Sequence, residues 1–414
     1  MLRAFLSSFS VILIGVGCAF LTHMILAKVL NAAEYGVFSF VYSISLLLSV
    51  ISLFGFQNSV VRLIPNYQKH FDKIKGLIKF SRVFTFCIAI ISAFICFLCL
   101  KLFGLDNKYP IEALYLSFLI TPLMVSMRLH AAFMRGFEKS MLSVLYETSL
   151  REILLLTAIG SSFLIGCKIA SGFDALILLT ISLFVVSIVA WWNTRFTLGQ
   201  KAPTSDKPSF EVKEWITISL PMMFTIFAQR LLRRSDIIIL GAMVNPALVG
   251  AYAIVTQFSD VSAIGQKGVF AVFSARAASL YKSQDIKSLK VLYRKMQLYG
   301  VLSAAVLCLC IGLISPYLLD FFGEEYRVAY YALLILLAGQ FVNVCFGPIG
   351  ILMIMTQYER VIMKFTFMVA IGNIIFNPIA IYFYGLEGAA IVTSFFLICH
   401  PALSYLFMKK KHIL

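Results

Sequence analysis

Charged side chains are scarce in this sequence. Only 13% of its 414 residues are Asp, Glu, Lys or Arg, whereas 61% are hydrophobic. A soluble globular domain averages about 25% charged and about 45–50% apolar residues. Apolar stretches of about 20 residues, the length that crosses a hydrocarbon core of roughly 30 Å as a helix, recur along the chain. The composition therefore excludes a soluble globular domain and predicts an all-α integral membrane protein.

Three further absences narrow the range of functions. The chain has no phosphate-binding loop of the G-x-x-x-x-G-K type, so we expect no ATP hydrolysis. Cys96 and Cys99 lie in an apolar stretch with no nearby histidine, so we expect neither a metal site nor a cofactor. The chain also lacks the long outer loop that a polysaccharide polymerase or a lipid-dependent glycosyltransferase needs for its catalytic groups. We therefore expect a protein that is not an enzyme.

Hydropathy divides the sequence into membrane-spanning segments separated by short polar turns. Each segment holds roughly 20–30 mainly apolar residues, as a helical crossing requires. The predicted fold is about twelve transmembrane helices. The segments are 4–27, 37–60, 83–103, 111–133, 141–166, 174–193, 215–243, 247–275, 296–316, 328–355, 361–384 and 388–408.

The first segment has a second interpretation, as a signal peptide. Arg3 precedes an apolar run, and Gly15–Cys18 faintly resembles a lipidation site. Cleavage would remove the counterpart of the seventh segment, because the two halves of the chain repeat each other. We therefore expect the segment to be retained.

The repeat is visible at the boundaries of the segments. Three pairs of stretches correspond, at offsets of 214, 214 and 221 positions: Leu26–Gly36 with Leu240–Gly250, Tyr67–Lys69 with Tyr281–Ser283, and Met134–Lys139 with Met355–Arg360. An even number of crossings returns each half to the same side of the membrane, so the copies must be parallel and related by an axis along the membrane normal. The polar stretch 195–213 separates them. We predict a bundle over 1–194, a cytoplasmic linker over 195–213 and a second bundle over 214–414.

The net charge of +16 fits a membrane protein. Roughly 25 of the Lys and Arg residues fall at or near loops on one side, and about five on the other. This bias places both termini in the cytoplasm. The basic loops are short and lack interleaved aromatic residues, so we expect no nucleic-acid partner.

The seventh segment carries a cluster of charges at membrane depth. Arg230, Arg233 and Arg234 lie near the middle of a helix of about 30 residues and share one face at spacings of three and four. Three arginines facing lipid would cost on the order of 7–10 kcal/mol, so this face is expected to line protein or water. Asp236 is three residues from Arg233, close enough to pair with it. Guanidinium groups suit phosphate, because they offer several fixed donors and keep their charge.

A competing interpretation ends this helix near Leu232, with the arginines at an interface. Residues 237–256 would then form a separate crossing, giving thirteen. That arrangement would put the basic 276–295 loop outside and break the pairing of the first and seventh segments. We favour the cavity-lining cluster.

Polar residues in two other segments have two interpretations each. Glu147 and Arg151 stand at i,i+4 and either neutralise each other or provide a second positive wall, with Glu147 or Glu152 as a proton carrier. In the eighth segment, Asp260 either binds a coupling ion or makes a structural contact, and Lys267 adds positive charge. Three arginines near cytoplasmic ends of segments are expected to be interfacial anchors: Arg62, Arg128 and Arg135.

Several stretches resemble the bacterial polysaccharide flippases of the O-antigen, Wzx type. They are Leu26–Gly36, Ser52–Arg62, Arg234–Asp236 running into Leu240–Gly241, and Asn373–Asn377 running into Tyr384–Ala390. This family belongs to the superfamily that also contains the multidrug MATE exporters and the lipid II flippases. The resemblance covers essentially the whole chain, and its motifs are diffuse.

The resemblance implies two parallel six-helix bundles around a central cavity. It further implies alternating-access transport of an undecaprenyl-pyrophosphate-linked oligosaccharide across the inner membrane. Arg230, Arg233 and Arg234 would then grip the pyrophosphate, helped by Arg151 and Lys267. The coupling candidates for a proton or sodium ion are Asp236, Asp260, Glu147 and Glu152. Expected partners are the lipid-linked oligosaccharide, membrane lipids and polysaccharide polymerase machinery. The alternative is an ion-coupled multidrug or cation antiporter on the same fold.

Overall fold

The computed structural model describes residues 2–68, 70–166, 168–201 and 207–411. Within these ranges only the backbone is described for residues 2–9, 12, 201, 267–272, 274, 275 and 278. The described residues form helices joined by short turns, with no strand among them. The all-α fold class predicted from composition is confirmed.

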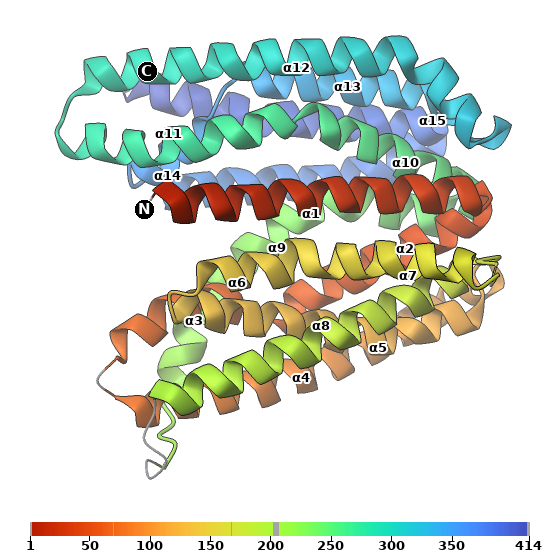
Figure 1. Ribbon diagram of the computed structural model, residues 1–414. Coiled ribbons are helices and arrows are strands. Elements are labelled where there is room, and N and C mark those ends of the chain that lie inside the picture. Colours follow the sequence, from red (N-terminus) through yellow and green to blue (C-terminus); the bar gives the residue numbers. More distant parts are fainter. Residues whose placement is uncertain (1, 69, 167, 202–206, 412–414) are drawn as a thin grey trace. The chain divides into compact units, whose positions relative to one another are not determined.

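The first half contains six membrane-length segments (Figure 1). Two of them are interrupted, the second by a turn and the fifth by a stretch of π-helix. In chain order they are α1 (Leu2–Val29); α2 (Ala32–Ser52) with α3 (Phe56–Asn66); α4 (Phe71–Leu102); α5 (Ile111–Gly136), preceded by the 3-10 turn η1 (Leu105–Asn107); α6 (Ser140–Val144), the π-helix η2 (Leu145–Leu150) and α7 (Arg151–Leu164); and α8 (Gly172–Lys201).

The second half contains six more. They are α9 (Val212–Met243); α10 (Pro246–Ser262) with α11 (Ile264–Lys282); α12 (Ile286–Phe322); the 3-10 turn η3 (Glu324–Ala329) with α13 (Tyr330–Cys345) and α14 (Ile349–Met355); and two crossings within α15 (Glu359–Lys410). The backbone of Gly385, with φ 56 and ψ −129, is not helical and separates these last two. Both ends of every predicted segment lie in an observed helix or within two residues of one, but several helices extend further: α4 begins 12 residues and α12 10 residues before the predicted starts at 83 and 296.

Eight of the described helices are long and apolar enough to cross a membrane by length and composition alone. The other four crossings do not meet that criterion, each for a local reason. The searched part of the first is only Leu13–Val29, and α15 counts once for two crossings. The fifth is divided by η2, and the eighth by the break at Ala263. About twelve crossings therefore account for the described helices.

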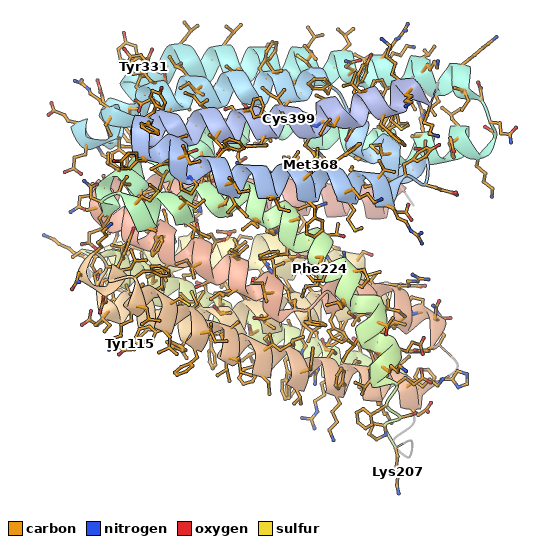
Figure 2. All side chains as sticks on the ribbon, turned by 180° about the vertical axis from the view of Figure 1, so that it is seen from behind. Tyr115, Lys207, Phe224, Tyr331, Met368 and Cys399 are labelled. Atoms are coloured by element: carbon orange, nitrogen blue, oxygen red, sulfur yellow. The ribbon has the colours of Figure 1, made fainter. Side chains whose placement is uncertain are left out.

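Large apolar side chains lie exposed along the helices. Tyr115 on α5, Tyr331 on α13 and Met368 on α15 are examples that Figure 2 labels. An exposed apolar surface on this scale is unfavourable in water and favourable in lipid. The surface is that of a membrane protein.

The repeat predicted from sequence recurs in the way two helices begin. Asn31 caps α2 by accepting a hydrogen bond from the Glu34 amide at 2.8 Å, and Asn245 caps α10 by accepting one from the Leu248 amide at 2.9 Å. An N-cap side chain satisfies an amide that the helix leaves without a partner. The two asparagines therefore have the same role in each half, as N-caps.

The third predicted match has the wrong register. Glu138 and Gln357 both adopt a φ of 65° just beyond a helix end. The amide that follows each donates back to the helix over 2.8 Å, from Lys139 to the Met134 carbonyl and from Tyr358 to the Met353 carbonyl. These turns are related by 219 positions, so the offset of 221 is out by two residues. The residue of left-handed conformation just beyond each helix end fixes the register in which the two halves correspond. The similarity of the side chains did not reveal that register.

The chain divides by contacts into an N-terminal unit, Met1–Arg230, and a C-terminal unit, Leu231–Leu414. In the N-terminal unit α5 is central, since it packs against α2, α3, α4 and α8. In the C-terminal unit α13 is central, since it packs against α10, α12 and α15. The fourth crossing of each half is thus its core helix. The predicted bundle boundaries at 194 and 214 remain a prediction.

The contact boundary falls within α9 because the first part of that helix packs in the N-terminal unit. A Cβ atom on Gly55 would lie 2.1 Å from the Ser219 carbonyl oxygen, so only glycine allows this approach, and its φ of 79° also favours glycine. Close by, the hydroxyls of Ser59 and Ser219 are 2.6 Å apart. Trp215, fully buried, donates to the Tyr67 hydroxyl over 3.3 Å.

The predicted linker 195–213 is shorter in the structure, because α8 continues to Lys201 and α9 begins at Val212. Its last residues are held by a polar contact. Lys73 forms an ion pair with Glu211 at 2.6 Å, and the Tyr67 hydroxyl donates to Glu211 over 3.0 Å. The Lys73 ammonium holds the pKa of the Glu211 carboxyl below its ordinary value, and burial raises the pKa of Tyr67 to about 12.

Candidate functional site

α9 runs without a break through Arg230, Arg233 and Arg234. Arg230 lies 13 residues before the end of the helix, about 20 Å at 1.5 Å per residue, and therefore near the middle of a membrane span. The competing interpretation, in which the helix stops near Leu232, does not describe this structure. Arg233 is exposed, Arg230 and Arg234 are half-buried, and the following residues Ser235 and Asp236 are buried.

The Asp236 carboxylate is not paired with Arg233, contrary to the sequence-based expectation. Its side chain, 3% exposed, accepts hydrogen bonds from the Tyr252 hydroxyl at 3.1 Å and the Thr393 hydroxyl at 3.5 Å. It also accepts from the Ile237 amide at 2.8 Å. The spacing of three residues allows a pair, but the hydroxyls of Tyr252 and Thr393 take the buried Asp236 carboxylate, whereas the Arg233 side chain is exposed. Arg233 and Arg234 form no ion pair with any described residue.

A second polar group lies beside Asp236 on α9. The Ser235 hydroxyl donates to the Asn373 side-chain oxygen at 2.7 Å, and the Asn377 amide donates to the same oxygen at 3.2 Å. Both asparagines are fully buried on α15, and the Asn373 amide nitrogen and the Asn377 oxygen have no described partner. Buried polar atoms are normally satisfied, so this pair has capacity for a water or a ligand group.

The two remaining candidates in the C-terminal unit lie elsewhere. Asp260 is exposed near the end of α10, and no ion pair with a described residue involves it. Lys267 belongs to α11, but its side chain lies outside the part that the structure describes. Their roles as a coupling group and a positive wall remain predictions.

In the N-terminal unit Glu147 and Arg151 do not pair, so the interpretation in which they neutralise each other is wrong. Glu147 instead accepts from Arg135 on α5 at 2.6 Å, and Arg151 pairs with its neighbour Glu152. The cause is η2, the π-helix that contains Glu147 and ends just before Arg151. A π-helix takes more residues per turn than an α-helix, so residues at i,i+4 no longer lie above one another. Arg135, expected to be an interfacial anchor, is the partner of a carboxylate instead.

Arg128 is the residue that sequence reasoning placed least well. Its side chain was expected at an interface, but it is 6% exposed on α5, eight residues before the helix ends. It donates to the Ser49 hydroxyl at 3.1 Å, and its Nε atom has no described partner. The charges of Arg230, Glu147 and Arg151 lie close enough to act on it. Arg128 stands five residues before the predicted end of its segment at 133, but α5 continues to Gly136 and places it about 12 Å inside the helix end.

The charges of this cluster do not cancel. Arg128, Arg135 and Arg151 face two carboxylates, Glu147 and Glu152, and both carboxylates are taken by other arginines than Arg128. Arg151 also lies 5.9 Å from the centre of the Tyr42 ring, a cation–π distance. The N-terminal unit therefore keeps an excess of positive charge at membrane depth.

Comparison with protein families gives two matches. The model of the polysaccharide biosynthesis protein family matches residues 1–275, and the MatE model matches residues 221–379. No curated protein matches the chain. The first match covers well over half of the sequence.

Comparison with solved structures shows the fold. An inward-facing multidrug resistance MATE family transporter of the MOP superfamily has a TM-score of 0.71 at 13% identity, over 98% of each chain. The lipid II flippase MurJ, in an inward closed conformation, has a TM-score of 0.73 at 15% identity, over 99% of this chain and 87% of that one. A MOP superfamily transporter from Pyrococcus furiosus, described as having a binding pocket of reverse polarity, has a TM-score of 0.57 at 13% identity, over 99% of this chain and 95% of that one. At such identities the likeness establishes the fold alone.

Proposed function

Because the chain belongs to the polysaccharide biosynthesis protein family and has the fold of MOP superfamily transporters, we propose that it is a lipid-linked oligosaccharide flippase. Its cargo would be undecaprenyl-pyrophosphate-linked repeat units of O-antigen or a related surface polysaccharide. They would cross the inner membrane by alternating access, with both termini of the protein in the cytoplasm. Polymerase machinery would receive them on the other side.

The observation that carries this proposal is that Arg233 and Arg234 on α9 form no ion pair with a described residue. Asp236, the nearest carboxylate in sequence, bonds to Tyr252 and Thr393. Arg233 and Arg234 therefore keep their charge at a depth where facing lipid would cost each of them about 2.5–3.5 kcal/mol. A diphosphate offers several charged oxygens, and a planar guanidinium group can bind two of them with paired hydrogen bonds. We assign Arg230, Arg233 and Arg234 to the pyrophosphate, with Lys267 as a further contributor.

The N-terminal unit supplies a second group for the same task. Arg128 is buried without a carboxylate of its own, and Arg151 shares its charge with Glu152. An anion that reached this cluster would meet a net positive field. We propose that Arg151, assisted by Arg128, contacts the pyrophosphate at one stage of transport.

The second candidate function is an ion-coupled multidrug or cation antiporter. The MatE match covers residues 221–379, which include Asp236. A buried carboxylate with two hydroxyl donors is a plausible place for a coupling proton or sodium ion, and Asp236 is the coupling candidate that we favour. Glu147 and Glu152 are occupied by arginines, and Asp260 is exposed. In the antiporter, removing Asp236 should abolish transport and removing the α9 arginines should not.

A complementation experiment separates the two functions. In a strain without this protein, the Arg233→Gln, Arg234→Gln double variant should lower surface polysaccharide by about tenfold or more, because each charged hydrogen bond contributes about 1.5–3 kcal/mol. Untranslocated lipid-linked repeat units, measured in membrane extracts, should accumulate. The Arg233→Lys, Arg234→Lys double variant should keep part of the activity, since lysine retains the charge without the paired donors.

The matched control is Arg62→Gln, which removes one positive charge from an exposed position on α3. It should leave both surface polysaccharide and membrane extracts unchanged. Normal polysaccharide in the Arg233→Gln, Arg234→Gln double variant, together with loss of drug efflux in Asp236→Asn, would replace the flippase by the antiporter.

A further inference from the structure

The N-terminal unit contains a cavity apart from the clusters considered so far. Its volume is about 310 Å³, and it lies among α4, α5 and α8. Its walls are mainly apolar, with a few polar groups. The lining includes Arg82, Phe86, Val125, Ser126, His130 and Trp191. Phe86 and Trp191 are also exposed on the surface of the unit, so the cavity reaches the face where apolar side chains meet lipid.

One basic side chain in this cavity lacks a counter-ion. Arg82 lies 5.8 Å from the centre of the Phe133 ring, and its buried Nε atom has no described hydrogen-bond partner. No carboxylate occurs among the described residues that line the cavity, and the charge that acts on Arg82 is that of another arginine, Arg195. A half-buried guanidinium with like charge beside it favours an anion.

A second polar group points to the same ligand. His130 is 3% exposed, and its Nδ1 atom lies 2.7 Å from the Ser126 carbonyl oxygen. Because a carbonyl only accepts, Nδ1 carries the hydrogen. The Nε2 atom is then left as a buried acceptor, and it has no described partner. A ligand that supplies a hydroxyl hydrogen would satisfy it.

We propose that this cavity binds an anionic phospholipid whose head group carries a free hydroxyl. Its phosphate lies against Arg82, its hydroxyl donates to Nε2 of His130, and an acyl chain follows the exposed apolar wall at Phe86. Arg82 is 11 residues into α4 and Trp191 is 10 residues before the end of α8, so the polar groups lie about 15 Å inside the helix ends on the side of the linker. A long, flexible arginine reaches a head group from that depth. The site is independent of the proposed transport function.

Native mass spectrometry of the purified full-length chain tests this proposal, with dioleoyl phosphatidylglycerol and dioleoyl phosphatidylcholine as probes. Both lipids offer a phosphate to Arg82, but only phosphatidylglycerol has a hydroxyl for His130 and lacks a choline cation beside the arginine, so the wild type should bind it about tenfold more tightly than phosphatidylcholine. His130→Phe should abolish this preference, and Arg82→Gln should weaken the binding of both lipids. Arg62→Gln, an exposed charge loss on α3, should leave both unchanged. An unchanged preference in His130→Phe, or binding by Arg82→Gln as tight as that of the wild type, would overturn the assignment.

A second measurement separates a lipid from a soluble phosphate. Inorganic phosphate or glycerol 3-phosphate in millimolar excess should not displace phosphatidylglycerol, because the acyl chain contributes to binding. Displacement would assign the cavity to a soluble phosphate compound and overturn the lipid. Phosphatidylglycerol with brominated acyl chains should also quench the fluorescence of the wild type more than that of Trp191→Phe, and equal quenching would contradict the placement of the chain.

Discussion

The N-terminal and C-terminal units handle buried charge differently. In the N-terminal unit each carboxylate of the cluster is bound by an arginine, through the pairs Arg135–Glu147 and Arg151–Glu152. In the C-terminal unit Asp236 is bound by the hydroxyls of Tyr252 and Thr393. A carboxylate satisfied by hydroxyls leaves neighbouring arginines available to another anion. The position of a charged residue along a membrane helix therefore does not show whether that residue is structural. The residues with which it forms hydrogen bonds and ion pairs do.

The largest expected effect comes from breaking a pair in the N-terminal unit. Glu152→Gln leaves Arg151 buried without its counter-charge, which should destabilise the protein by about 3–5 kcal/mol. The midpoint of unfolding in denaturing detergent measures this. Glu112→Gln, on the exposed start of α5, is the control and should change it little. Equal midpoints for the two variants would mean that the pair does not stabilise the unit.

A smaller effect is expected from the hydroxyl that holds Asp236. Tyr252→Phe removes a donor from a buried carboxylate, and should lower the free energy of unfolding by about 1.5–3 kcal/mol. Tyr317→Phe removes an exposed hydroxyl and should be neutral. If Tyr252→Phe proved as harmless as its control, Asp236 would have to draw its stabilisation from elsewhere, and the contrast between the units would weaken.

The matched helix caps test whether the two halves are equivalent where no charge is involved. Asn31→Ala and Asn245→Ala should each cost about 1 kcal/mol, because each removes the acceptor for one amide at the start of a helix. The same unfolding midpoints measure both. A difference of more than about 1 kcal/mol between them would show that the repeat at the sequence level does not extend to the energetics.

The smallest effect is a pH dependence at the linker. The pKa of Glu211 is lowered in the folded protein by Lys73, so its stabilisation is complete above the unfolded pKa of about 4.3 and is lost as the pH falls through the lower, folded value. Glu211→Gln should therefore lower Tm slightly at neutral pH, and the difference from the wild type should shrink on acidification. A constant difference from neutral pH to about pH 3 would rule out the ion pair as its source.

Much of the fold followed from local pattern. Runs of apolar residues located the crossings but not the full helices, because α4 and α12 continue beyond the apolar run that a bilayer requires. The repeat paired Asn31 with Asn245, and each caps a helix through a preference that depends on neighbouring residues only. The depth of Arg230, Arg233 and Arg234 also followed from counting residues along one unbroken helix.

The partners of the charged residues did not follow in this way. Glu147 does not pair with Arg151, because the π-helix η2 changes the number of residues per turn. No residue type in that stretch indicates a π-helix. Arg128 looked interfacial until the packing of α5 against α2 placed it beside Ser49.

By itself the sequence determined that this chain spans a membrane about twelve times, that its halves correspond, and that arginines lie at membrane depth. Each of these depends on the composition or spacing of nearby residues. Only the tertiary structure decided which arginines are neutralised. Asp236 meets Thr393 across 157 positions of sequence, and such a contact depends on how whole helices pack and rotate against each other. The angular register of a helix is set by all of its neighbours, so a pairwise spacing along the chain cannot supply it.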